Sequence, residues 1–345
     1  MKKVLIFGSG SIGNHMAYAC RRLSLDVFVT DIDIKALERM RYQIYPQRYK
    51  KWDNKIKQIQ FKQIEKINVF FDLIIIGTPP ETHFSIYDFC LKKIKFNKIL
   101  IEKPLTNYKS RSLNLYKKKF LKKFIFCGYN HSVSKSFQFF LKKFSNEKKN
   151  VNSIIVDWCE SWSGILNAHF WMKSPFESYL GNMQKGGGAL QEHSHGLHLL
   201  ILLLKKVGID LITTNFKSDY ICEAKGNLRY DIFSKLFGYK KKIYFNYNTD
   251  LFTFPAKKKI TVKSNEKQIE WICNYKNGVD VVKVFRRGLL YYKKTFKKTR
   301  SSEFENEIKH ILKIKTLKQQ NNSNLNPYFA ITTLKVIKKI FVNEK

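Results

Sequence analysis

The sequence predicts an α/β domain of the Rossmann type, with a doubly wound parallel sheet, followed by an α+β domain with a mostly antiparallel sheet. Three observations support this fold class. Apolar runs of strand length alternate with helix-forming segments over residues 1–128, as in a parallel sheet covered on both faces. A glycine-rich turn follows the first of these runs. In residues 129–345 several strand-like segments follow one another without helices between them, which favours antiparallel pairing.

The first thirty-one residues read as a strand, a glycine turn, a helix and a second strand. Val4–Phe7 is the first apolar run, Gly8-Ser9-Gly10-Ser11-Ile12-Gly13 forms the turn, and Val27–Val29 leads to Asp31. In such a unit the first glycine permits the turn, the second lets the backbone approach a pyrophosphate, and the third allows close helix–strand packing. The N-terminus of the helix then offers N–H groups to phosphates. An ordinary strand–helix turn is the alternative interpretation.

This pattern predicts a dinucleotide site, and Asp31 favours NAD over NADP. A carboxylate at the end of the second strand accepts hydrogen bonds from the adenosine ribose and repels a 2′-phosphate. The residues that we expect to bind the dinucleotide here are Gly8, Gly10, Ser11, Ile12, Gly13 and Asp31.

Further strands are expected at Phe70–Ile76, Lys98–Ile101 and Phe124–Cys127. Each ends in a polar or glycine-containing segment, and ligands of doubly wound sheets bind at the carboxyl ends of the strands. The segments in question are Thr78–His83, Glu102–Pro104 and Tyr129–His131. From them we expect cofactor contacts at Thr78, Pro79, His83, Glu102 and Lys103, and substrate contacts at Tyr129 and Asn130.

The second domain is expected to begin with a strand at Ile154–Trp158, followed by an aromatic loop that includes Trp171 and Tyr179. Gly186-Gly187-Gly188 then opens a helix over Ala189–Lys205. Two closing helices are predicted at Ser302–Lys315, where Ser302 and Glu305 resemble a capping box, and at Pro327–Phe341. The strand-like segments between these helices are Leu211–Phe216, Asn227–Phe233, Lys242–Tyr247, Lys259–Val262, Gln268–Cys273 and Val279–Val284.

The composition excludes several classes of protein. With 44% hydrophobic and 15% aromatic residues the chain is globular rather than disordered. No apolar stretch reaches the roughly 18 residues that a membrane span needs. Six scattered cysteines without a CxxC pair favour a reducing compartment, so we expect a cytoplasmic protein.

The formal net charge is +37, which is compatible with a nucleic-acid partner or an anionic surface. However, the lysines are distributed along the whole chain, together with abundant Asn, Ile, Phe and Tyr, as a composition bias would produce. No nucleic-acid-binding motif accompanies them. We therefore expect solvated lysine-rich faces and no nucleic-acid partner.

Lys103 is the first candidate for proton transfer. It follows a parallel strand at the ligand end of the sheet, and the positive charge of a nicotinamide ring nearby would lower its pKa. One more lysine in a lysine-rich chain is the structural alternative.

Glu192 and His195 are the second candidates. On a helix they lie three positions apart and share a face, whereas His193 lies about 200° from His195. This geometry argues against a metal site built from His193, His195 and His198, so we expect no metal. The preceding glycines permit close approach to a ligand. A structural histidine in a helix is the alternative to a catalytic one.

Taken together, these residues resemble the glucose–fructose oxidoreductase/inositol dehydrogenase (Gfo/Idh/MocA) family over nearly the whole chain. The shared motifs are Gly8-x-Gly10-x-x-Gly13, Asp31, Thr78-Pro79-Pro80-x-x-His83, Glu102-Lys103-Pro104, Gly128-Tyr129-Asn130, Gly186–Gly188 with Glu192 and His195, and Phe304-x-x-Glu307-Ile308. The family usually has Asp at the position of Glu192. Many members also have a gap of four rather than three residues before the histidine.

The resemblance implies a Rossmann domain and a second domain with an open-faced antiparallel sheet, through which members often dimerise. It also implies oxidation or reduction of sugars, sugar derivatives or cyclitols with NAD or NADP. His195 would act as general acid/base, Glu192 would orient it, and Lys103 would hold or relay the proton. Tyr129, Asn130, Trp171 and Tyr179 would line the substrate pocket. A homo-oligomer, dimer or tetramer, is expected.

Two other functions are compatible with the same residues. One is a glycosidase that uses NAD transiently and releases no net NADH. The other is a non-catalytic protein that binds a dinucleotide or nucleic acid through its positive charge.

Overall fold

The computed structural model describes residues 1–110, 113–120, 124–167, 172–276 and 278–342. The chain forms two compact units. The first contains Met1–Thr106, the described residues within 111–130, and Arg300–Pro327. The second contains Asn107–Ser110, the described residues within 131–299, and those that follow Pro327.

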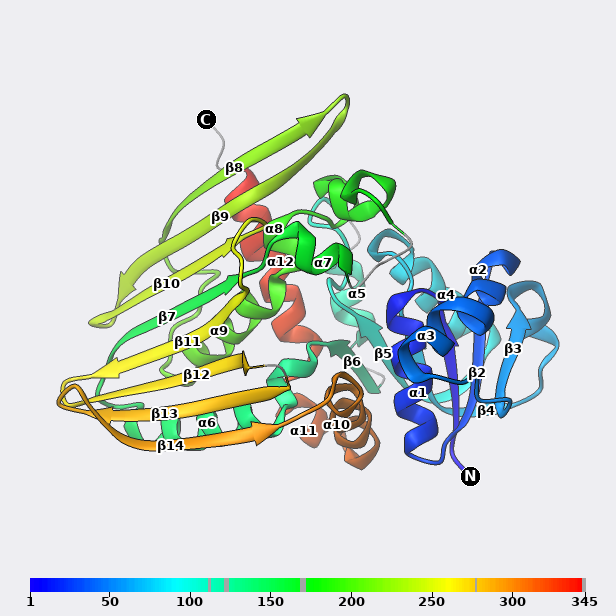
Figure 1. Ribbon diagram of the computed structural model, residues 1–345, viewed down its shortest axis with the longest axis horizontal. Helices are drawn as coiled ribbons and strands as arrows, with labels where there is room; N and C mark the ends of the chain where they lie inside the picture. The colour runs from blue at the N-terminus through cyan, green and yellow to red at the C-terminus, as the bar shows by residue number, and fades with distance from the viewer. Residues whose placement is uncertain (111–112, 121–123, 168–171, 277, 343–345) are drawn as a thin grey trace. The chain divides into compact units, whose positions relative to one another are not determined.

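The first unit is built on a six-stranded parallel sheet with the order β3-β2-β1-β4-β5-β6 (Figure 1). The carboxyl-terminal residues of strands β1, β4 and β5 are buried, because helices cover the sheet and the apolar side chains of both strand faces need partners. All carboxyl ends lie at one edge of the sheet, since every pairing is parallel. The strands are β1 (Lys3–Phe7), β2 (Asp26–Asp31), β3 (Ile56–Gln60), β4 (Phe70–Ile76), β5 (Lys95–Glu102) and β6 (Phe124–Gly128).

Helix α10 packs on α1 in this unit, and the ring of Phe304 stacks on His15 with centroids 5.2 Å apart. Lys98 of β5 is buried and donates hydrogen bonds to the carbonyls of Ile311 and Leu312, at the carboxyl end of α10. The α-helices are α1 (Ser11–Arg22), α2 (Ile34–Arg39), α3 (Tyr45–Tyr49), α4 (His83–Lys93), α5 (Leu113–Phe120), α10 (Arg300–Lys313) and α11 (Leu317–Asn321).

The second unit contains an eight-stranded sheet with the order β14-β13-β12-β11-β7-β10-β9-β8. Its pairings are antiparallel except for β7 with β10. The strands are β7 (Val151–Cys159), β8 (Lys217–Lys225), β9 (Leu228–Lys240), β10 (Ile243–Asp250), β11 (Lys257–Ser264), β12 (Lys267–Lys276), β13 (Val279–Arg286) and β14 (Leu289–Lys297).

Helices cover one face of this sheet (Figure 1). Trp158 of β7 and Trp271 of β12 are buried on that face, where Phe137 of α6 packs on Trp271. Gly196 lets α9 approach closely, because a Cβ there would lie 2.6 Å from the Cβ of Trp158. The α-helices are α6 (Lys135–Glu147), α7 (Trp162–Asn167), α8 (Ala189–Glu192), α9 (Ser194–Lys206) and α12 (Pro327–Val342).

The predicted fold class is confirmed, with local differences. Leu211–Phe216 is a turn rather than a strand, because Asp210 accepts a hydrogen bond from the N–H of Ile212 and starts a turn that ends before β8. Strands β3, β8 and β14 were not predicted from the sequence. Helix α10 begins at Arg300, so Ser302 lies inside it; a capping box forms instead at α11, between Thr316 and Gln319.

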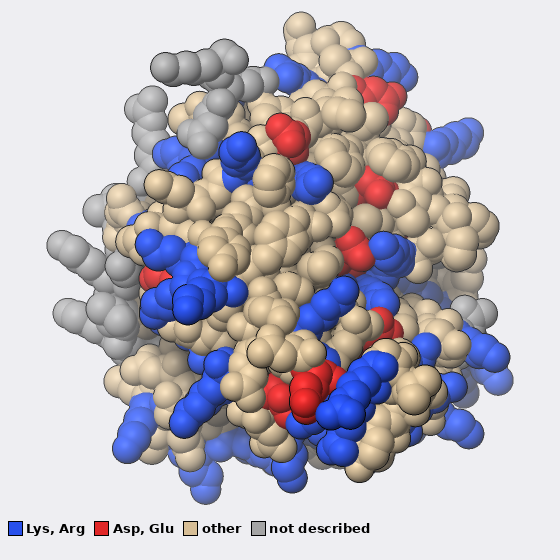
Figure 2. Space-filling view, turned by 90° about the vertical axis from the view of Figure 1, so that its left-hand side faces the viewer, with Lys and Arg blue, Asp and Glu red and all other residues tan. Residues whose placement is uncertain are grey.

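Lysine and arginine side chains are spread over the face of the molecule shown in Figure 2, with a few acidic groups among them. Some cations of the described residues form exposed ion pairs, such as Lys93–Glu65 and Arg287–Glu266, which contribute little to stability. Within the described ranges, the helices are too short or too polar to cross a membrane.

Candidate functional site

The glycine loop after β1 lies at the carboxyl edge of the parallel sheet. Gly8 has a positive φ of 97°, which permits the turn. A Cβ at Gly13 would lie 1.9 Å from the carbonyl oxygen of Gly8, so α1 can pack here only without a side chain. At Gly10, by contrast, a Cβ would meet nothing within 4 Å. The protein therefore leaves open space beside the N-terminus of α1, where a pyrophosphate would bind.

Asp31 is tied to the glycine loop. Its Oδ2 accepts hydrogen bonds from the backbone N–H and the hydroxyl of Ser9, both 2.8 Å long. Its Oδ1 accepts one from the N–H of Asp33. The carboxylate is partly exposed, and each of its oxygens has more than one lone pair. Asp31 thus holds the glycine loop by hydrogen bonds, and its oxygens can still accept a hydrogen bond from a further hydroxyl group.

Arg48 is a residue near the predicted phosphate position that the sequence analysis missed. Its guanidinium donates hydrogen bonds to the carbonyl and hydroxyl oxygens of Ser11, each 3.0 Å long. Burial lowers the pKa of Arg48, and the nearby charge of Arg300 lowers it further. Arg48 lies in α3, within a basic stretch without strong periodicity, so no sequence signal distinguished it from the other cations.

His83 positions the loop that follows β4. Its ring is fully buried, with Nε2 2.8 Å from the carbonyl oxygen of Thr78 and Nδ1 3.1 Å from that of Leu105. Burial lowers the pKa of His83 to about 4, although the carbonyl oxygens beside its ring nitrogens oppose the shift. His83 thus contacts the carbonyl groups of Thr78, in the segment that follows β4, and of Leu105, in the segment that follows β5. Ile12 of α1 packs against this loop, where a Cβ at Gly77 would lie 3.1 Å from its Cγ2.

Glu102 is buried at the end of β5, and its Oε2 accepts a hydrogen bond from the backbone N–H of Lys103. A Cβ at Gly128 would lie 2.6 Å from the Glu102 carboxyl carbon, so that glycine makes room for the acid. Burial raises the pKa of Glu102 to about 7, although Lys103 and Arg300 oppose the shift. The pKa of the buried Glu307 is also raised, by burial and by Glu102. Lys103 itself is half-buried.

The residues predicted to contact substrate differ in how far they are exposed to solvent. Tyr129 and Asn130 are buried at the end of β6, and Tyr179 is half-buried at the start of a short 3-10 helix, Tyr179–Gly181. Trp171 lies outside the described residues.

Two of the three consecutive glycines of the second unit, Gly187 and Gly188, make room for the protein itself. A Cβ at Gly187 would lie 2.2 Å from the carbonyl oxygens of Tyr179 and Leu180, and one at Gly188 would lie 2.0 Å from Oδ1 of Asp231. Asp231 is fully buried and accepts a hydrogen bond from the N–H of Leu190 at the start of α8. Burial raises the pKa of Asp231 to about 6. The sequence predicted that these glycines permit close approach to a ligand. The groups that approach Gly187 and Gly188 closely in the structure are Asp231 and the Tyr179–Gly181 segment.

The predicted helix over Ala189–Lys205 is broken at His193, between α8 and α9. The carbonyl of His193 accepts hydrogen bonds from the Tyr247 hydroxyl and the N–H of Gly196. The His195 ring lies 4.8 Å from the ring of His131. His195 is half-buried, whereas His193 is only 3% exposed.

The three clustered histidines have different neighbours. His195 is beside His131, the ring of His198 meets Phe329, and the charge of His193 acts on Glu160. His131 lies in the segment after β6 that was expected at the ligand end of the sheet, but it was not among the residues predicted to contact a ligand.

Glu160 is a further acid near Glu192 and His193. Its Oε2 forms an ion pair with Lys258 at 2.7 Å. Burial raises the pKa of Glu160, but the Lys258 ammonium outweighs this and lowers it below its usual value. Glu160 is therefore ionised at neutral pH.

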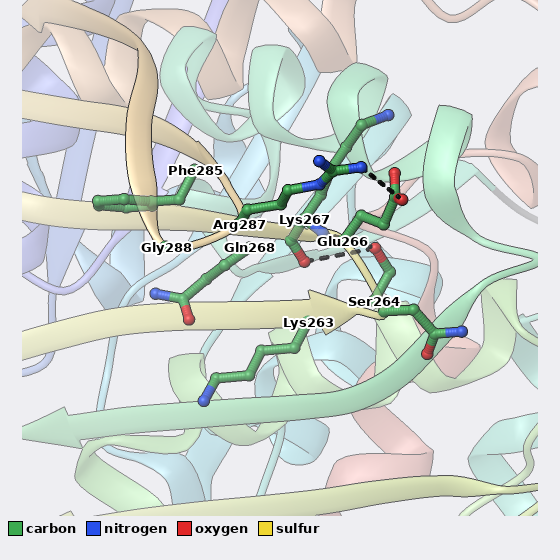
Figure 3. Close-up of a pocket in the computed structure, with 9 residues that line it drawn as sticks. Lys263, Ser264, Glu266, Lys267, Gln268, Phe285, Arg287 and Gly288 are labelled. Carbon is green, nitrogen blue, oxygen red and sulfur yellow. Dashed lines mark hydrogen bonds and ion pairs between the residues drawn. The ribbon is translucent and has the colours of Figure 1, made fainter.

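A cavity of about 300 Å³ lies elsewhere on the second unit, at the ends of the β11–β12 and β13–β14 hairpins (Figure 3). Its walls include Gln268, Phe285 and the exposed ion pair between Arg287 and Glu266. None of the predicted site residues lines it.

Residues 2–118 match the model of the GFO_IDH_MocA oxidoreductase family, described as having an NAD-binding Rossmann fold. The match confirms the predicted family resemblance over the first domain, which is the dinucleotide-binding domain of a dehydrogenase or reductase. No curated protein matches the sequence.

Solved structures with a similar fold extend the comparison over both domains. An aldose-aldose oxidoreductase from Caulobacter crescentus, complexed with glycerol, is 12% identical with a TM-score of 0.72, covering 99% of this chain and 96% of its own. A levoglucosan dehydrogenase in complex with NADH and levoglucosan is 11% identical with a TM-score of 0.70 and the same coverage. The 3-ketoreductase KijD10 from Actinomadura kijaniata, with NADP and TDP-benzene, is 10% identical with a TM-score of 0.68, covering 99% and 97%.

Proposed function

We propose that the chain, whose residues 2–118 belong to an oxidoreductase family with an NAD-binding Rossmann fold, transfers hydride between NAD and a carbinol carbon. The substrate would be a sugar, a sugar derivative or a cyclitol. Solved structures with a similar fold include an aldose-aldose oxidoreductase, a levoglucosan dehydrogenase and a 3-ketoreductase, which supports this class of substrate.

The observation that carries the proposal is the open space at Gly10. The other two glycines of the loop are required by the packing of the protein itself, but Gly10 is not. A dinucleotide pyrophosphate fits this position, since the N-terminus of α1 supplies N–H groups and Arg48 adds positive charge beside Ser11. When bound, the nicotinamide supplies or accepts the hydride.

The preference for NAD rests on Asp31. Its partly exposed carboxylate suits the 2′-hydroxyl of the adenosine ribose and disfavours a 2′-phosphate. Solved structures of similar fold contain either NADP or NADH, so the preference of this chain depends on its own residue at that position.

We assign proton transfer to Lys103, His195 and Glu192. His195 takes the proton from the substrate hydroxyl during oxidation and returns it during reduction. Glu192 is half-buried and lies three residues before His195 in the sequence; it orients the imidazole. Lys103 holds or relays the proton. Tyr129, Asn130, Tyr179 and Trp171 are assigned to the substrate pocket.

The test is a spectrophotometric assay at 340 nm, where reduced nicotinamide absorbs, with NAD and NADP and a panel of substrates. The panel contains free aldoses, anhydrosugars, nucleotide-linked sugars and cyclitols, with 3-keto sugars for the reverse direction. A sugar-dependent change in absorbance supports the proposal. Glycoside cleavage without net NADH formation would show the glycosidase alternative, and salt-sensitive binding to DNA without turnover would show the binding-protein alternative.

We also propose that the chain forms a homo-oligomer through the face of the eight-stranded sheet that helices do not cover. Tyr244 of β10 is 38% exposed, while its neighbour Phe245 is buried on the helix-covered face. Size-exclusion chromatography with light scattering tests this. A Tyr244→Glu variant should shift the protein towards the monomer.

A further inference from the structure

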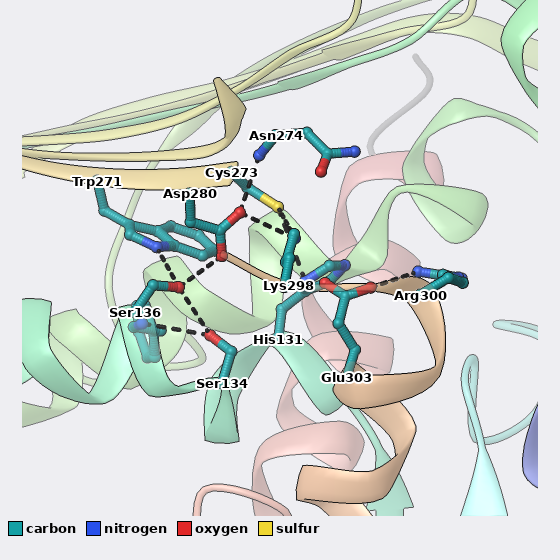
Figure 4. Close-up of polar contacts among 11 residues, drawn as sticks. His131, Ser134, Ser136, Trp271, Cys273, Asn274, Asp280, Lys298, Arg300 and Glu303 are labelled. Atoms are coloured by element: carbon teal, nitrogen blue, oxygen red, sulfur yellow. Dashed lines mark hydrogen bonds and ion pairs between the residues drawn. The ribbon is translucent and has the colours of Figure 1, made fainter. Parts of the chain in front are cut away.

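The second unit contains a contact between a cysteine and a lysine that the proposed reaction does not use. The Nζ atom of Lys298 lies 3.3 Å from the Sγ atom of Cys273 (Figure 4). Cys273 lies in the second half of β12 and is 3% exposed, and Lys298 follows β14. The two strands lie on either side of β13.

Several features of the fold hold this pair in place. The register of β12 and β13 shifts between Ile272 and Lys276, so a bulge changes the direction of the chain near Cys273. Asn274, inside the bulge, has a positive φ of 55°. The backbone N–H of Lys298 donates a hydrogen bond to the carbonyl of Gly278.

Asp280 holds the Lys298 ammonium at 2.8 Å and is itself 1% exposed. It also accepts hydrogen bonds from the hydroxyl of Ser136, at 2.6 Å, and from the N–H of Asn274, at 2.9 Å. The ammonium is therefore fixed between a buried carboxylate and the sulfur. This arrangement differs from a solvated lysine that touches a cysteine by chance.

We propose that Cys273 and Lys298 form a redox-sensitive pair, which hydrogen peroxide converts into a reversible covalent S–N crosslink. The positive charge of Lys298 stabilises the thiolate, which is the form that reacts with peroxide. The side chain of Lys298 is 12% exposed, so the pair is at the edge of the protein interior, within reach of a molecule little larger than water.

The chemistry needs one molecule of peroxide. The Cys273 thiolate attacks a peroxide oxygen, the O–O bond breaks, and the sulfur is oxidised to a sulfenic acid. The departing hydroxide takes a proton from the Lys298 ammonium and leaves as water. The neutral amine then attacks the sulfur; the S–N bond forms, the S–O bond breaks, and the oxygen leaves as a second water with a proton from nitrogen. The pair loses two hydrogen atoms in total.

A thiol reductant reverses the reaction. It attacks the sulfur, breaks the S–N bond and regenerates Cys273 and Lys298, while two reductant thiols become a disulfide.

The crosslink would change the surroundings of His131. The Sγ atom of Cys273 lies 3.9 Å from Nδ1 of His131, whose ring contacts that of His195. The crosslinked nitrogen also no longer carries the charge that pairs with Asp280. The pair thus offers a route from oxidation to the histidine that we assign to proton transfer.

The test is peptide mapping by mass spectrometry of the full chain after treatment with hydrogen peroxide. Digestion uses a protease that does not cut at lysine, so that the modification cannot alter the cleavage pattern. The expected product joins the peptides containing Cys273 and Lys298, weighs two hydrogen atoms less than their sum, and disappears after thiol reduction. Recovery of Cys273 as a sulfinic acid or unmodified, with the Lys298 peptide unlinked, would overturn the proposal.

Four variants support the assignment. Cys273→Ser and Lys298→Gln should each abolish the linked product. Lys297→Gln, at an exposed neighbouring lysine, and Cys159→Ser should retain it. Burial raises the pKa of Cys159 to about 12, so that thiol is a poor nucleophile. The wild-type measurement requires no variant to fold and no enzymatic activity, so it is independent of the proposed function.

Discussion

A Cβ atom at Gly13 would lie 1.9 Å from the carbonyl oxygen of Gly8, a separation that no real pair of these atoms adopts. Gly13 is thus required for folding, whereas Gly10 has open space and an ordinary φ of −72°. The two positions separate the structural role of the glycine loop from its role in ligand binding.

We therefore expect Gly13→Ala to lower the free energy of unfolding by about 3 kcal/mol, through overpacking of α1. Gly10→Ala should unfold like the wild type but bind NAD about tenfold more weakly or worse, equivalent to about 1.4 kcal/mol. Thermal unfolding and NAD titration by calorimetry measure the two effects. A destabilised Gly10→Ala protein would contradict the open space at this position.

The second prediction concerns the choice of dinucleotide. NAD should bind at least about tenfold more tightly than NADP, because Asp31 repels a 2′-phosphate. In Asp31→Asn the amide oxygen still accepts the hydrogen bonds from Ser9, but the negative charge is lost. The ratio of the affinities for NAD and NADP should therefore decrease. Titration of both proteins with both dinucleotides checks this. Equal affinities in the wild type would refute the prediction.

The third prediction concerns proton transfer. Lys103→Met and His195→Ala should each lower kcat by about 10²–10⁴, the usual effect of removing a proton-transfer group. The affinity for NAD should change little, since the glycine loop and Asp31 are untouched.

His193→Ala is the matched control for His195→Ala. His193 is buried, so its loss should lower the unfolding temperature while reducing kcat much less. If His193→Ala lost as much activity as His195→Ala with the fold intact, the catalytic assignment would be wrong.

The fourth prediction is a dependence of stability on pH caused by Glu102 and Glu307. Burial raises the pKa of Glu102 from 4.5 to about 7. Between these values the folded chain keeps a proton that the unfolded chain has released, so the free energy of unfolding falls as the pH rises through this window. The pKa of Glu307 is raised as well, which strengthens the trend.

Chemical denaturation at a series of pH values measures this effect. Glu307→Gln removes one acid from the buried pair and should flatten the decline between about pH 4.5 and 7, as the neutral amide needs no proton. An unchanged slope in this variant would exclude the pair as its source. Glu65→Gln changes an exposed acid and serves as the control.

The fifth prediction is that activity persists after exhaustive chelation. Among the described residues, His193, His195 and His198 do not form a group whose ligand atoms could converge on one ion. The assay is turnover before and after dialysis against a chelator. Activity that is lost on chelation and restored by Zn²⁺ would contradict it.

Much of the first domain could be predicted because its signals are local. The apolar runs of β1, β4 and β5 identify buried strands, and the spacing of Gly8, Gly10 and Gly13 identifies the turn between strand and helix. Strand β3 was missed because its residues Ile56–Gln60 alternate with polar side chains in a basic stretch. The strand itself lies at the edge of the sheet, where little apolar surface is needed.

The sequence by itself determined the dinucleotide loop, the acid at the end of β2 and the change from parallel to antiparallel pairing, since each depends on neighbours along the chain. Tertiary structure decided the rest. Only the folded chain places Asp231 against Gly188, Arg48 on Ser11, and Lys298 beside Cys273. These partners are 43, 37 and 25 residues apart, and no local spacing encodes such contacts. They arise because sheet order and helix packing bring distant segments together, and burial then requires each polar group to find a partner there.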